Sequence, residues 1–471
     1  MAAEERLEWM TAREIAARVA AKSLSPVEVA RATLDRIARL DPQIHAFLTV
    51  CEDQAMASAR EAEAAVARGD PLGPLHGVPM SVKDEAWVKG VRATMGSLLY
   101  ENFVPDEDST AVQRLREAGA IIVGKTNVPE FMSWGRTTNR LGPETVNPWD
   151  TRRCPGASSG GAGAALAAGF GPIAVGSDGG GSIRIPSALC GLMGLYPTPG
   201  RIPDTNSFSY ARVGSLGPMA RDVRDLATML NVMAGPDGRD QRSPPPLRDV
   251  FAELEQGVKG MAFAFTPDFG RIALQPGLGE TVRAATATLA DLGARVEEPG
   301  LQFPDVWPWF SAAIDDDGAL KERPFTRSAA FKTLCADNLD RLTDYGRGVA
   351  QARLTPEALE AAKARTAAVK AQFAELFERY DAILSPTLPV VAPVLTEGSG
   401  DLYPEFCCGT YFTAIVNVAE LPAASYPCGL LDGLPVGLQV IGPPGREDRV
   451  LRILRTLEQA LPFTAHPPAF A

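Results

Sequence analysis

PIAVGSDGGGSIRIPS, residues 172–187, is the most informative segment of this chain. An apolar run typical of a buried strand leads into Asp178, then Gly179, Gly180 and Gly181, and then Ser182. Glycine loses more backbone entropy on folding than any other residue, so a fold keeps three together where side chains are excluded or φ must be positive. The segment therefore predicts a strand, a tight turn that something approaches closely, and one serine presented at its end.

Similar apolar segments recur along the chain and alternate with stretches of helical periodicity. Strands are predicted at 119–127, 171–176, 260–268, 380–387 and 433–443, with another ending at Lys83. Helices are predicted at 53–68, 110–118, 158–169, 220–234, 278–293, 355–380 and 446–460, preceded by two short helices capped by Thr11 and Ser25. This alternation predicts an α/β protein with a central mixed β-sheet of many strands.

Composition limits the class of protein. The chain has 471 residues, 45% hydrophobic and 22% charged, as in globular proteins. Its net charge of −11 and the lack of a Lys/Arg block predict no nucleic-acid partner. Acidic residues precede any apolar run at the N-terminus, and no run reaches about 18 apolar residues, which predicts a cytoplasmic protein with no membrane association.

The chain contains neither an internal repeat nor a long linker, so we expect residues 1–471 to form a single domain. Its core is expected at about 60–235 and 380–460, and a more variable region that walls the substrate site at about 240–380. Seven cysteines without a C-x-x-C pair indicate reduced thiols. Three histidines far apart in sequence argue against a metal site.

The Gly/Ser stretches at 154–169 and 176–187 fit neither nucleotide-binding glycine motif. If the backbone N–H groups of Gly179, Gly180, Gly181 and Ser182 converge beside the Ser182 hydroxyl, they can stabilise the oxyanion formed by attack on a carbonyl. A serine nucleophile also needs a base within hydrogen-bond reach.

The base has several candidates. His76 and His466 both lie in Gly/Pro-rich surroundings. GASSG, residues 156–160, matches the nucleophile elbow that would use His466, but the polar DTRRCP before it is not typical of the required strand. Lys83 ends an apolar stretch, and to be neutral near pH 7 its pKa must fall by about 3 units, equivalent to about 4 kcal/mol. The alternative for Lys83 is a surface pair with Asp84.

Four segments together resemble the amidase signature family of serine hydrolases. They are HGVPMSVKD, PGASSGGAGAALAAG, DGGGSIRIPSALCGLMGLYPTPGRIP and NVAELPAASYPCGLLDGLPVGLQVIGP, and the similarity covers most of 10–235 and 380–460. The resemblance implies a mixed sheet covered by helices on both faces. It also implies a Ser-cisSer-Lys triad, with Ser182 as nucleophile, Ser158 as the bridging serine after a cis peptide, and Lys83 as base. No metal or organic cofactor is implied.

The same resemblance implies that Ser159 supports the loop, and we expect Ser159 and Trp134 to contact substrate. The family pattern is altered at Ala157, Gly179 and Tyr196, none of which removes a catalytic group. Asp178 and Arg184 flank the nucleophile and are better explained as loop scaffolding than as substrate binders. Other candidates for an apolar wall are Phe208, Tyr210, Trp307, Trp309 and Phe310.

The function expected is a free-standing amidase that hydrolyses the C–N bond of small apolar or aryl linear amides, with carbamates (urethanes) and esters as further substrates. Its partner would be a small-molecule amide or carbamate, and a homodimer is the assembly considered. The alternative is the glutaminase component of a tRNA-dependent amidotransferase, its A subunit, although the segment 300–380 does not resemble that component. The third hypothesis is a non-enzymatic binding protein, against which Lys83, Ser158 and Ser182 all argue.

Overall fold

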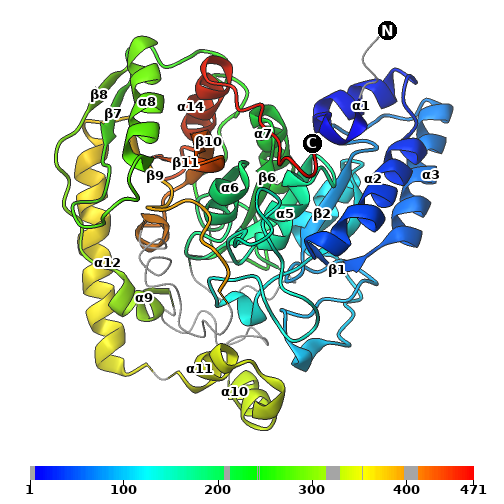
Figure 1. The fold of residues 1–471 in the computed structure, drawn as a ribbon, viewed down its shortest axis with the longest axis horizontal. Coiled ribbons are helices and arrows are strands. Elements are labelled where there is room, and N and C mark those ends of the chain that lie inside the picture. The colour runs from blue at the N-terminus through cyan, green and yellow to red at the C-terminus, as the bar shows by residue number, and fades with distance from the viewer. Residues whose placement is uncertain are drawn as a thin grey trace.

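The fold is built on one large mixed β-sheet. A computed structural model describes residues 6–205, 213–240, 242, 244–314, 329–352, 354–396 and 412–471. Within these residues the sheet has eleven strands in the order β1-β3-β2-β4-β6-β5-β10-β11-β9-β7-β8. Figure 1 shows β7 and β8 on one side of the molecule and β1 and β2 toward the other. Strand β2 is parallel to β3 and β4, and β7 is parallel to β8 and β9, while the other pairs are antiparallel. The predicted α/β class and mixed sheet are confirmed.

The strands are β1 Phe47–Val50, β2 Pro79–Lys83, β3 Ile121–Thr126, β4 Ile173–Asp178, β5 Met193–Tyr196, β6 Ser215–Ala220, β7 Ala262–Phe265, β8 Arg295–Glu297, β9 Ala382–Pro386, β10 Ala423–Leu431 and β11 Leu434–Ile441. The α-helices are α1 Ala12–Ala20, α2 Pro26–Leu40, α3 Glu52–Arg68, α4 Thr110–Glu117, α5 Gly160–Ala167, α6 Arg184–Cys190, α7 Val223–Met233, α8 Leu278–Asp291, α9 Trp307–Ile314, α10 Ala329–Ala336, α11 Asp344–Gln351, α12 Pro356–Phe377 and α14 Glu447–Ala460. Short 3-10 helices are η1 Leu7–Trp9, η2 Asp41–Gln43, η3 Leu98–Tyr100, η4 Glu130–Met132 and η5 Leu339–Arg341.

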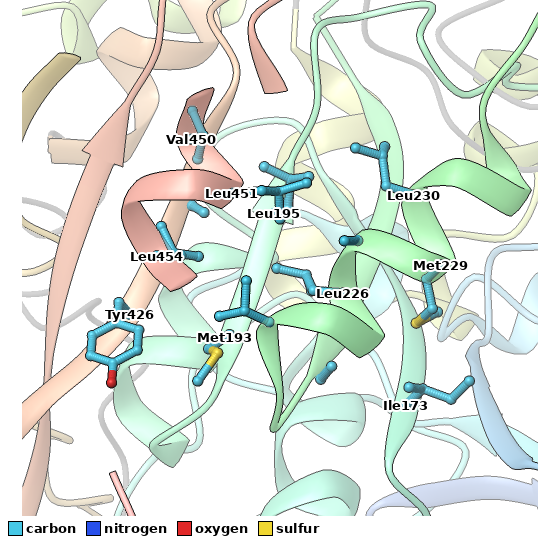
Figure 2. Close-up of a cluster of buried hydrophobic side chains, with 14 of the residues drawn as sticks. Ile173, Met193, Leu195, Leu226, Met229, Leu230, Tyr426, Val450, Leu451 and Leu454 are labelled. Atoms are coloured by element: carbon cyan, nitrogen blue, oxygen red, sulfur yellow. The ribbon is translucent and has the colours of Figure 1, made fainter. Parts of the chain in front are cut away.

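Helices cover both faces of the sheet. Helices α5 and α6 contact each other and pack on one face, whereas α7, α8 and α14 pack on the other. The side chains of β4 alternate between the two faces of the sheet. Ile173 and Val175 belong to the core under α7, and Ala174 belongs to the core under α5. Figure 2 shows the first of these cores, in which Leu226 and Leu230 of α7 meet Leu451 of α14 over the strands.

Several local signals explain the helix positions. Thr11 and Glu14 form the full capping box of α1. The Ser25 side chain accepts hydrogen bonds from the N–H groups of Val27 and Glu28, and Pro26 stands at the first position of α2. In α5, a Cβ on Gly161 would lie 2.6 Å from the Ala46 carbonyl oxygen, so close packing explains this Gly/Ala helix. No helix in the described part of the chain is long and apolar enough to span a membrane.

All six strands predicted from the sequence are present, but five others were not predicted: β1, β5, β6, β8 and β10. Strands β1 and β8 are short and lie at the two edges of the sheet. Strand β6 contains Gly217 and Pro218, and β10 contains Pro427 beside an irregularity in its pairing with β11. Glycine and proline weaken the strand pattern in a sequence, which is why these segments resembled loops.

Candidate active site

The site forms where two parallel strands end. Val82 of β2 pairs with Val175 of β4, so Lys83 and Ser177 lie side by side at the carboxyl ends of these two strands. Neighbouring parallel strands have their carboxyl ends on the same side of the sheet, so side chains that follow both strands can contact one another there. The strand predicted to end at Lys83 and the turn predicted after β4 are thus adjacent.

Lys83 is fully buried and lies between two serines. Its Nζ donates to Ser158 Oγ at 2.8 Å and to Ser177 Oγ at 2.6 Å. An ion pair joins Nζ to Glu85 Oε1 at 3.4 Å, and the Glu85 side chain is 3% exposed. The alternative of a surface pair with Asp84 is excluded, because Lys83 is buried and Asp84 Oδ2 instead accepts hydrogen bonds from Thr94.

Burial sets the acidity of this lysine. Loss of water around the ammonium lowers the pKa of Lys83 below its usual value, which is the direction that a lysine base requires. The negative charges of Glu85, Asp178 and Asp84 oppose that shift, and Glu85 has the largest opposing effect. The site therefore favours the neutral amine by desolvation and restrains that preference with nearby acids.

Ser158 enters the site directly before α5. The peptide bond between Ala157 and Ser158 is cis, as the family resemblance implied. The following residue ties this loop to the other one, since Ser159 N–H donates to the Ser182 carbonyl at 3.2 Å and Ser159 Oγ donates to the Ser177 carbonyl at 3.2 Å. Ser159 is completely buried, so the geometry supports its role in the loop, and its contact with substrate stays a prediction.

Ser182 lies at the end of the glycine turn and is half-buried, as are Gly179 and Gly180. Gly181 has a φ of 123°, in the region that only glycine adopts easily. Its N–H donates to Asp178 Oδ1 at 2.7 Å, so this group is already engaged. Among the described residues, the N–H groups of Gly179, Gly180 and Ser182 have no hydrogen-bond partner, and their convergence on an oxyanion stays a prediction.

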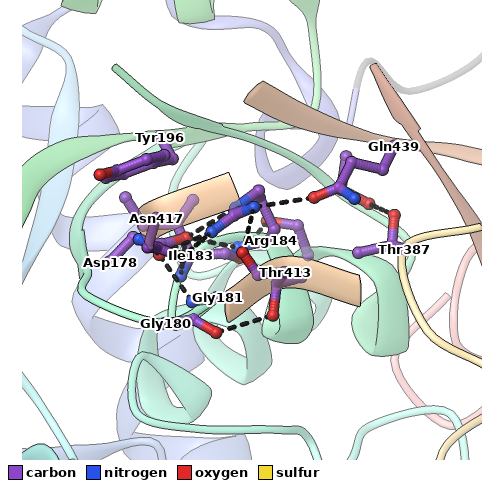
Figure 3. A network of polar contacts seen from close by, with 12 residues as sticks. Asp178, Gly180, Gly181, Ile183, Arg184, Tyr196, Thr387, Thr413, Asn417 and Gln439 are labelled. Atoms are coloured by element: carbon purple, nitrogen blue, oxygen red, sulfur yellow. Dashed lines mark hydrogen bonds and ion pairs between the residues drawn. The ribbon is translucent and has the colours of Figure 1, made fainter. Parts of the chain in front are cut away.

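A buried ionic network supports the turn (Figure 3). Asp178 and Arg184 form an ion pair at 3.0 Å with both side chains 0% exposed. Asn417 Nδ2 donates to Asp178 Oδ1 at 2.9 Å, and Arg184 Nη1 donates to Gln439 Oε1 at 2.8 Å. Burial alone would raise the pKa of Asp178, but Arg184 and the hydrogen bonds bring it below its usual value. The geometry supports the scaffolding role inferred for Asp178 and Arg184.

Aromatic side chains approach the site from a neighbouring helix. A Cβ on Gly180 would lie 3.0 Å from Cζ of Phe310, which places this ring of α9 against the glycine turn. Trp307 stacks on Phe310 with ring centroids 5.6 Å apart, and Trp134 stacks on Tyr345 at 4.8 Å. Phe208 and Tyr210 lie outside the described residues. Contact between Trp134 and substrate stays a prediction.

The competing bases lie elsewhere. A ring nitrogen of His76 contacts the Ala62 carbonyl at 3.0 Å, and His466 stacks on Trp9 with ring centroids 3.8 Å apart. Within the described residues there is no cluster of His, Cys, Asp or Glu that could hold a metal ion. Cys51, Cys154, Cys190, Cys335 and Cys428 are unpaired and buried, and Cys407 and Cys408 lie outside the described residues.

Sequence reasoning missed two groups that contact Lys83. Ser177 is a hydroxyl that follows the apolar part of β4 and precedes Asp178, and that break in the apolar pattern was the available signal. Glu85 was missed because two acids follow Lys83 and sequence cannot tell which one folds back toward it. The turn after β2, in which Ala86 N–H donates to the Lys83 carbonyl at 3.1 Å, returns Glu85 to the amine.

Known proteins resemble this chain along almost its whole length. Residues 28–451 match the Amidase family. The A subunit of the Moorella thermoacetica glutamyl-tRNA(Gln) amidotransferase is 36% identical, and the match covers 98% of this chain and 99% of that protein. A bacterial aryl acylamidase structure has a TM-score of 0.87 at 30% identity, covering 97% of both chains. The corresponding amidotransferase chain from Thermotoga maritima has a TM-score of 0.79 at 29% identity, covering 98% of this chain and 97% of that one.

These relatives contradict two predictions from the sequence. The sequence favoured a free-standing amidase for small apolar or aryl amides, but the curated relatives are subunits of an amidotransferase, matched from end to end. The unfamiliar segment 300–380 was therefore a poor guide. The prediction of no nucleic-acid partner is also wrong, because net charge describes one chain, whereas in an assembly the basic surface that holds RNA can belong to a different chain.

Both corrections leave the geometry of the site unchanged. Lys83 and Ser177 lie at the ends of adjacent parallel strands, in a fold shared with amide-cleaving enzymes. The family match over residues 28–451 and the relative at 36% identity show that this chain belongs to the amidase signature family, enzymes that hydrolyse C–N bonds.

Proposed function

We propose that this chain is the glutaminase component, the A subunit, of a tRNA-dependent amidotransferase. In this role it releases ammonia from glutamine, and the assembly uses that ammonia to amidate glutamyl-tRNA(Gln). The observation that carries the proposal is the end-to-end similarity to curated subunits of this kind, at 34–36% identity. Ser182, Ser158 and Lys83 are assigned as nucleophile, bridging serine and base.

The contacts of Lys83 suggest how the reaction starts. Once Nζ is neutral, the 2.8 Å hydrogen bond with Ser158 Oγ reverses its direction, so that the Ser158 hydroxyl donates and the amine accepts. Ser158 then takes the proton of Ser182 as its own passes to Lys83. The Ser182 oxygen bonds to the side-chain carbonyl carbon of glutamine, and the resulting oxyanion is met by the N–H groups of Gly179, Gly180 and Ser182.

The second half of the reaction reverses the relay. Lys83 returns the proton through Ser158 to the leaving nitrogen, the C–N bond breaks and ammonia departs, leaving a glutamyl ester on Ser182. Water then attacks this ester with the same residues taking and returning its proton, and glutamate is released. The side-chain amide of glutamine is a linear amide. Carbamate and ester hydrolysis would use the same oxyanion chemistry and stay predictions.

The proposal is tested by assaying glutamate and ammonia release from L-glutamine. The chain is assayed alone and with the other subunits of a bacterial glutamyl-tRNA(Gln) amidotransferase and glutamyl-tRNA(Gln), with p-nitroacetanilide, an aryl carbamate and an aryl ester as comparison substrates. We expect glutamine hydrolysis that increases in the assembly and is absent from Ser182→Ala. Anilide turnover without glutamine hydrolysis under any of these conditions would refute the proposal.

A further inference from the structure

Glu85 is a buried acid in contact with the proposed base. It follows β2 by two residues, and its side chain is 3% exposed. Its Oε1 is buried and receives no hydrogen bond from the described residues. The ion pair with Lys83 Nζ at 3.4 Å is therefore what compensates this oxygen in its surroundings.

The other charged groups around Lys83 make contacts of their own, although Asp84 Oδ1, like Glu85 Oε1, is buried and receives no hydrogen bond from the described residues. Asp178, on β4, is paired with Arg184. Asp84 Oδ2 accepts from the N–H and the hydroxyl of Thr94, both at 2.8 Å. From β3, Lys125 Nζ donates to the Asp84 carbonyl at 2.8 Å. Among the described residues, Glu85 is the one acid that forms an ion pair with the Lys83 amine.

Within the described part of the chain, the remaining elements packed on β2 bring no further charged side chain to this end. Helix α5 consists of glycine, alanine and leucine. Arg36 and Arg39 of α2 line a cavity with Pro79, which is the opposite end of the strand from Lys83. A change in the charge at Glu85 is therefore expected to act on Lys83, with which it pairs, and also on the buried Lys125, whose pKa Glu85 raises.

We propose that Glu85 is a positioning residue for the base, holding the Lys83 amine against Ser158 and Ser177 and setting the pH at which that amine becomes free to accept a proton. Desolvation alone would leave a weakly basic amine, and a general base works best when its proton affinity matches the working pH. The carboxylate keeps the buried amine basic. This inference rests on the proposed roles of Lys83 and Ser182, but not on glutamine being the substrate.

The test follows the reactivity of Ser182 directly. In the full chain, phenylmethanesulfonyl fluoride is attacked by Ser182 Oγ at sulfur, fluoride leaves, and the serine proton passes through Ser158 to Lys83. The labelling rate, measured by mass spectrometry from pH 5 to 10 with Ser182→Ala as blank, should rise to a plateau as the amine loses its proton. This readout is independent of glutaminase activity, so failure of the proposed function and failure of this inference are distinguishable.

Glu85→Gln keeps the shape and removes the charge. We expect the half-point of the labelling profile to move to lower pH by about one to three units, and the plateau rate to fall because the amine is a weaker base. Glu85→Asp withdraws the carboxylate by one methylene, so its half-point should move the same way by less. This second variant decides the question if Glu85→Gln does not fold.

The control is Glu447→Gln, which removes another buried carboxylate, the partner of Arg201 at 3.1 Å, with no contact to Lys83. Its half-point should match that of the parent chain. A purely structural role for Glu85 would lower the labelling rate equally at every pH. Half-points of both Glu85 variants that coincide with the parent, or a parent chain that is not labelled at Ser182, would overturn the inference.

Discussion

Asp178→Asn is the substitution whose effect the structure specifies best. The carboxylate accepts six hydrogen bonds in the described network, from the backbone of Gly181, Ile183 and Arg184, from two guanidinium nitrogens of Arg184 and from Asn417. Its ion pair with Arg184 has no solvent exposure on either side. An asparagine would remove the charge and direct an NH₂ group at N–H donors, leaving the Arg184 guanidinium buried without its counter-charge.

The expected loss is large for one substitution. Removing one partner of a buried ion pair destabilises by about 3–5 kcal/mol, because the remaining charge is left without compensation. A whole domain is stable by about 5–15 kcal/mol, so the variant should be markedly less stable but still able to fold. The same change frees Gly181 N–H from Asp178, so we expect the turn that carries Ser182 to lose its fixed shape and Ser182 its reactivity.

The measurement is urea unfolding at pH 7, with sulfonyl fluoride labelling of Ser182 in the folded state. Asp70→Asn is the matched control, since Asp70 pairs with Arg68 on the surface with side chains 43% and 61% exposed, and such pairs contribute about 0–1 kcal/mol. Asp178→Asn combined with Arg184→Gln removes both charges and should recover stability but not labelling. An unfolding free energy for Asp178→Asn within about 1 kcal/mol of the parent would refute the scaffolding argument.

Three further outcomes are expected. Ser182→Ala should abolish turnover and change the free energy of unfolding by no more than about 0.5 kcal/mol, because the side chain is half-buried; residual turnover would exclude Ser182 as nucleophile. Turnover of the parent should rise with pH through the lowered pKa of Lys83, since the ammonium cannot accept a proton, and Lys83→Met should lose at least about a hundredfold at every pH; a flat profile would contradict the relay. Gly181→Ala would put a Cβ 2.6 Å from Thr413 Cβ at a φ of 123° and should lower kcat, whereas Gly142→Ala, with nothing within 4 Å, should not; equal kcat values would show that the turn tolerates the side chain.

Acidic pH tests the Asp178 pair in another way. Its pKa is lower in the folded chain than the ordinary value of about 3.9 in the unfolded chain. Such a group contributes stability that is present above the unfolded value and is lost as pH falls through the folded value. Between pH 5 and 2 the parent should therefore lose more stability than the Asp178→Asn variant, as measured by urea unfolding at each pH.

The sequence predicted the framework well because periodicity and turn chemistry are local. Strand β4 is an apolar run closed by an acid and glycines, and α1 carries its complete capping box. Strands such as β6 and β10 were not predicted, because their proline and glycine are tolerated only through pairing with neighbouring strands. Pairing of that kind is a property of the assembled sheet, so no local pattern records it.

The groups proposed as catalytic could be named from the sequence because each stands in a motif, but their contact partners could not. Lys83 meets Ser177 from a strand almost a hundred residues later, and Arg184 meets Asn417 and Gln439 from the last third of the chain. The acid beside Lys83 also depends on a turn geometry that the letters KDE do not specify. These contacts depend on the register between neighbouring strands and on the turn after β2, and neither can be read from the spacing of residues in the sequence.

The error about function has a physical source of the same kind. In the proposed mechanism, the lysine, the two serines and the glycine turn stabilise one transition state, that of attack on an amide carbonyl, and they would do so for any acyl group bound beside them. Substrate choice depends on the side chains that line the site. Among them we expect Phe310 of α9, which lies against Gly180 and comes from a segment that carries no motif. Assembly into a complex is decided still farther out, by surfaces that catalysis does not constrain. A prediction built on the chemistry-bearing residues therefore assigns the reaction correctly and has little power over the substrate and the partners, and similarity spread over the whole chain is the better guide to both.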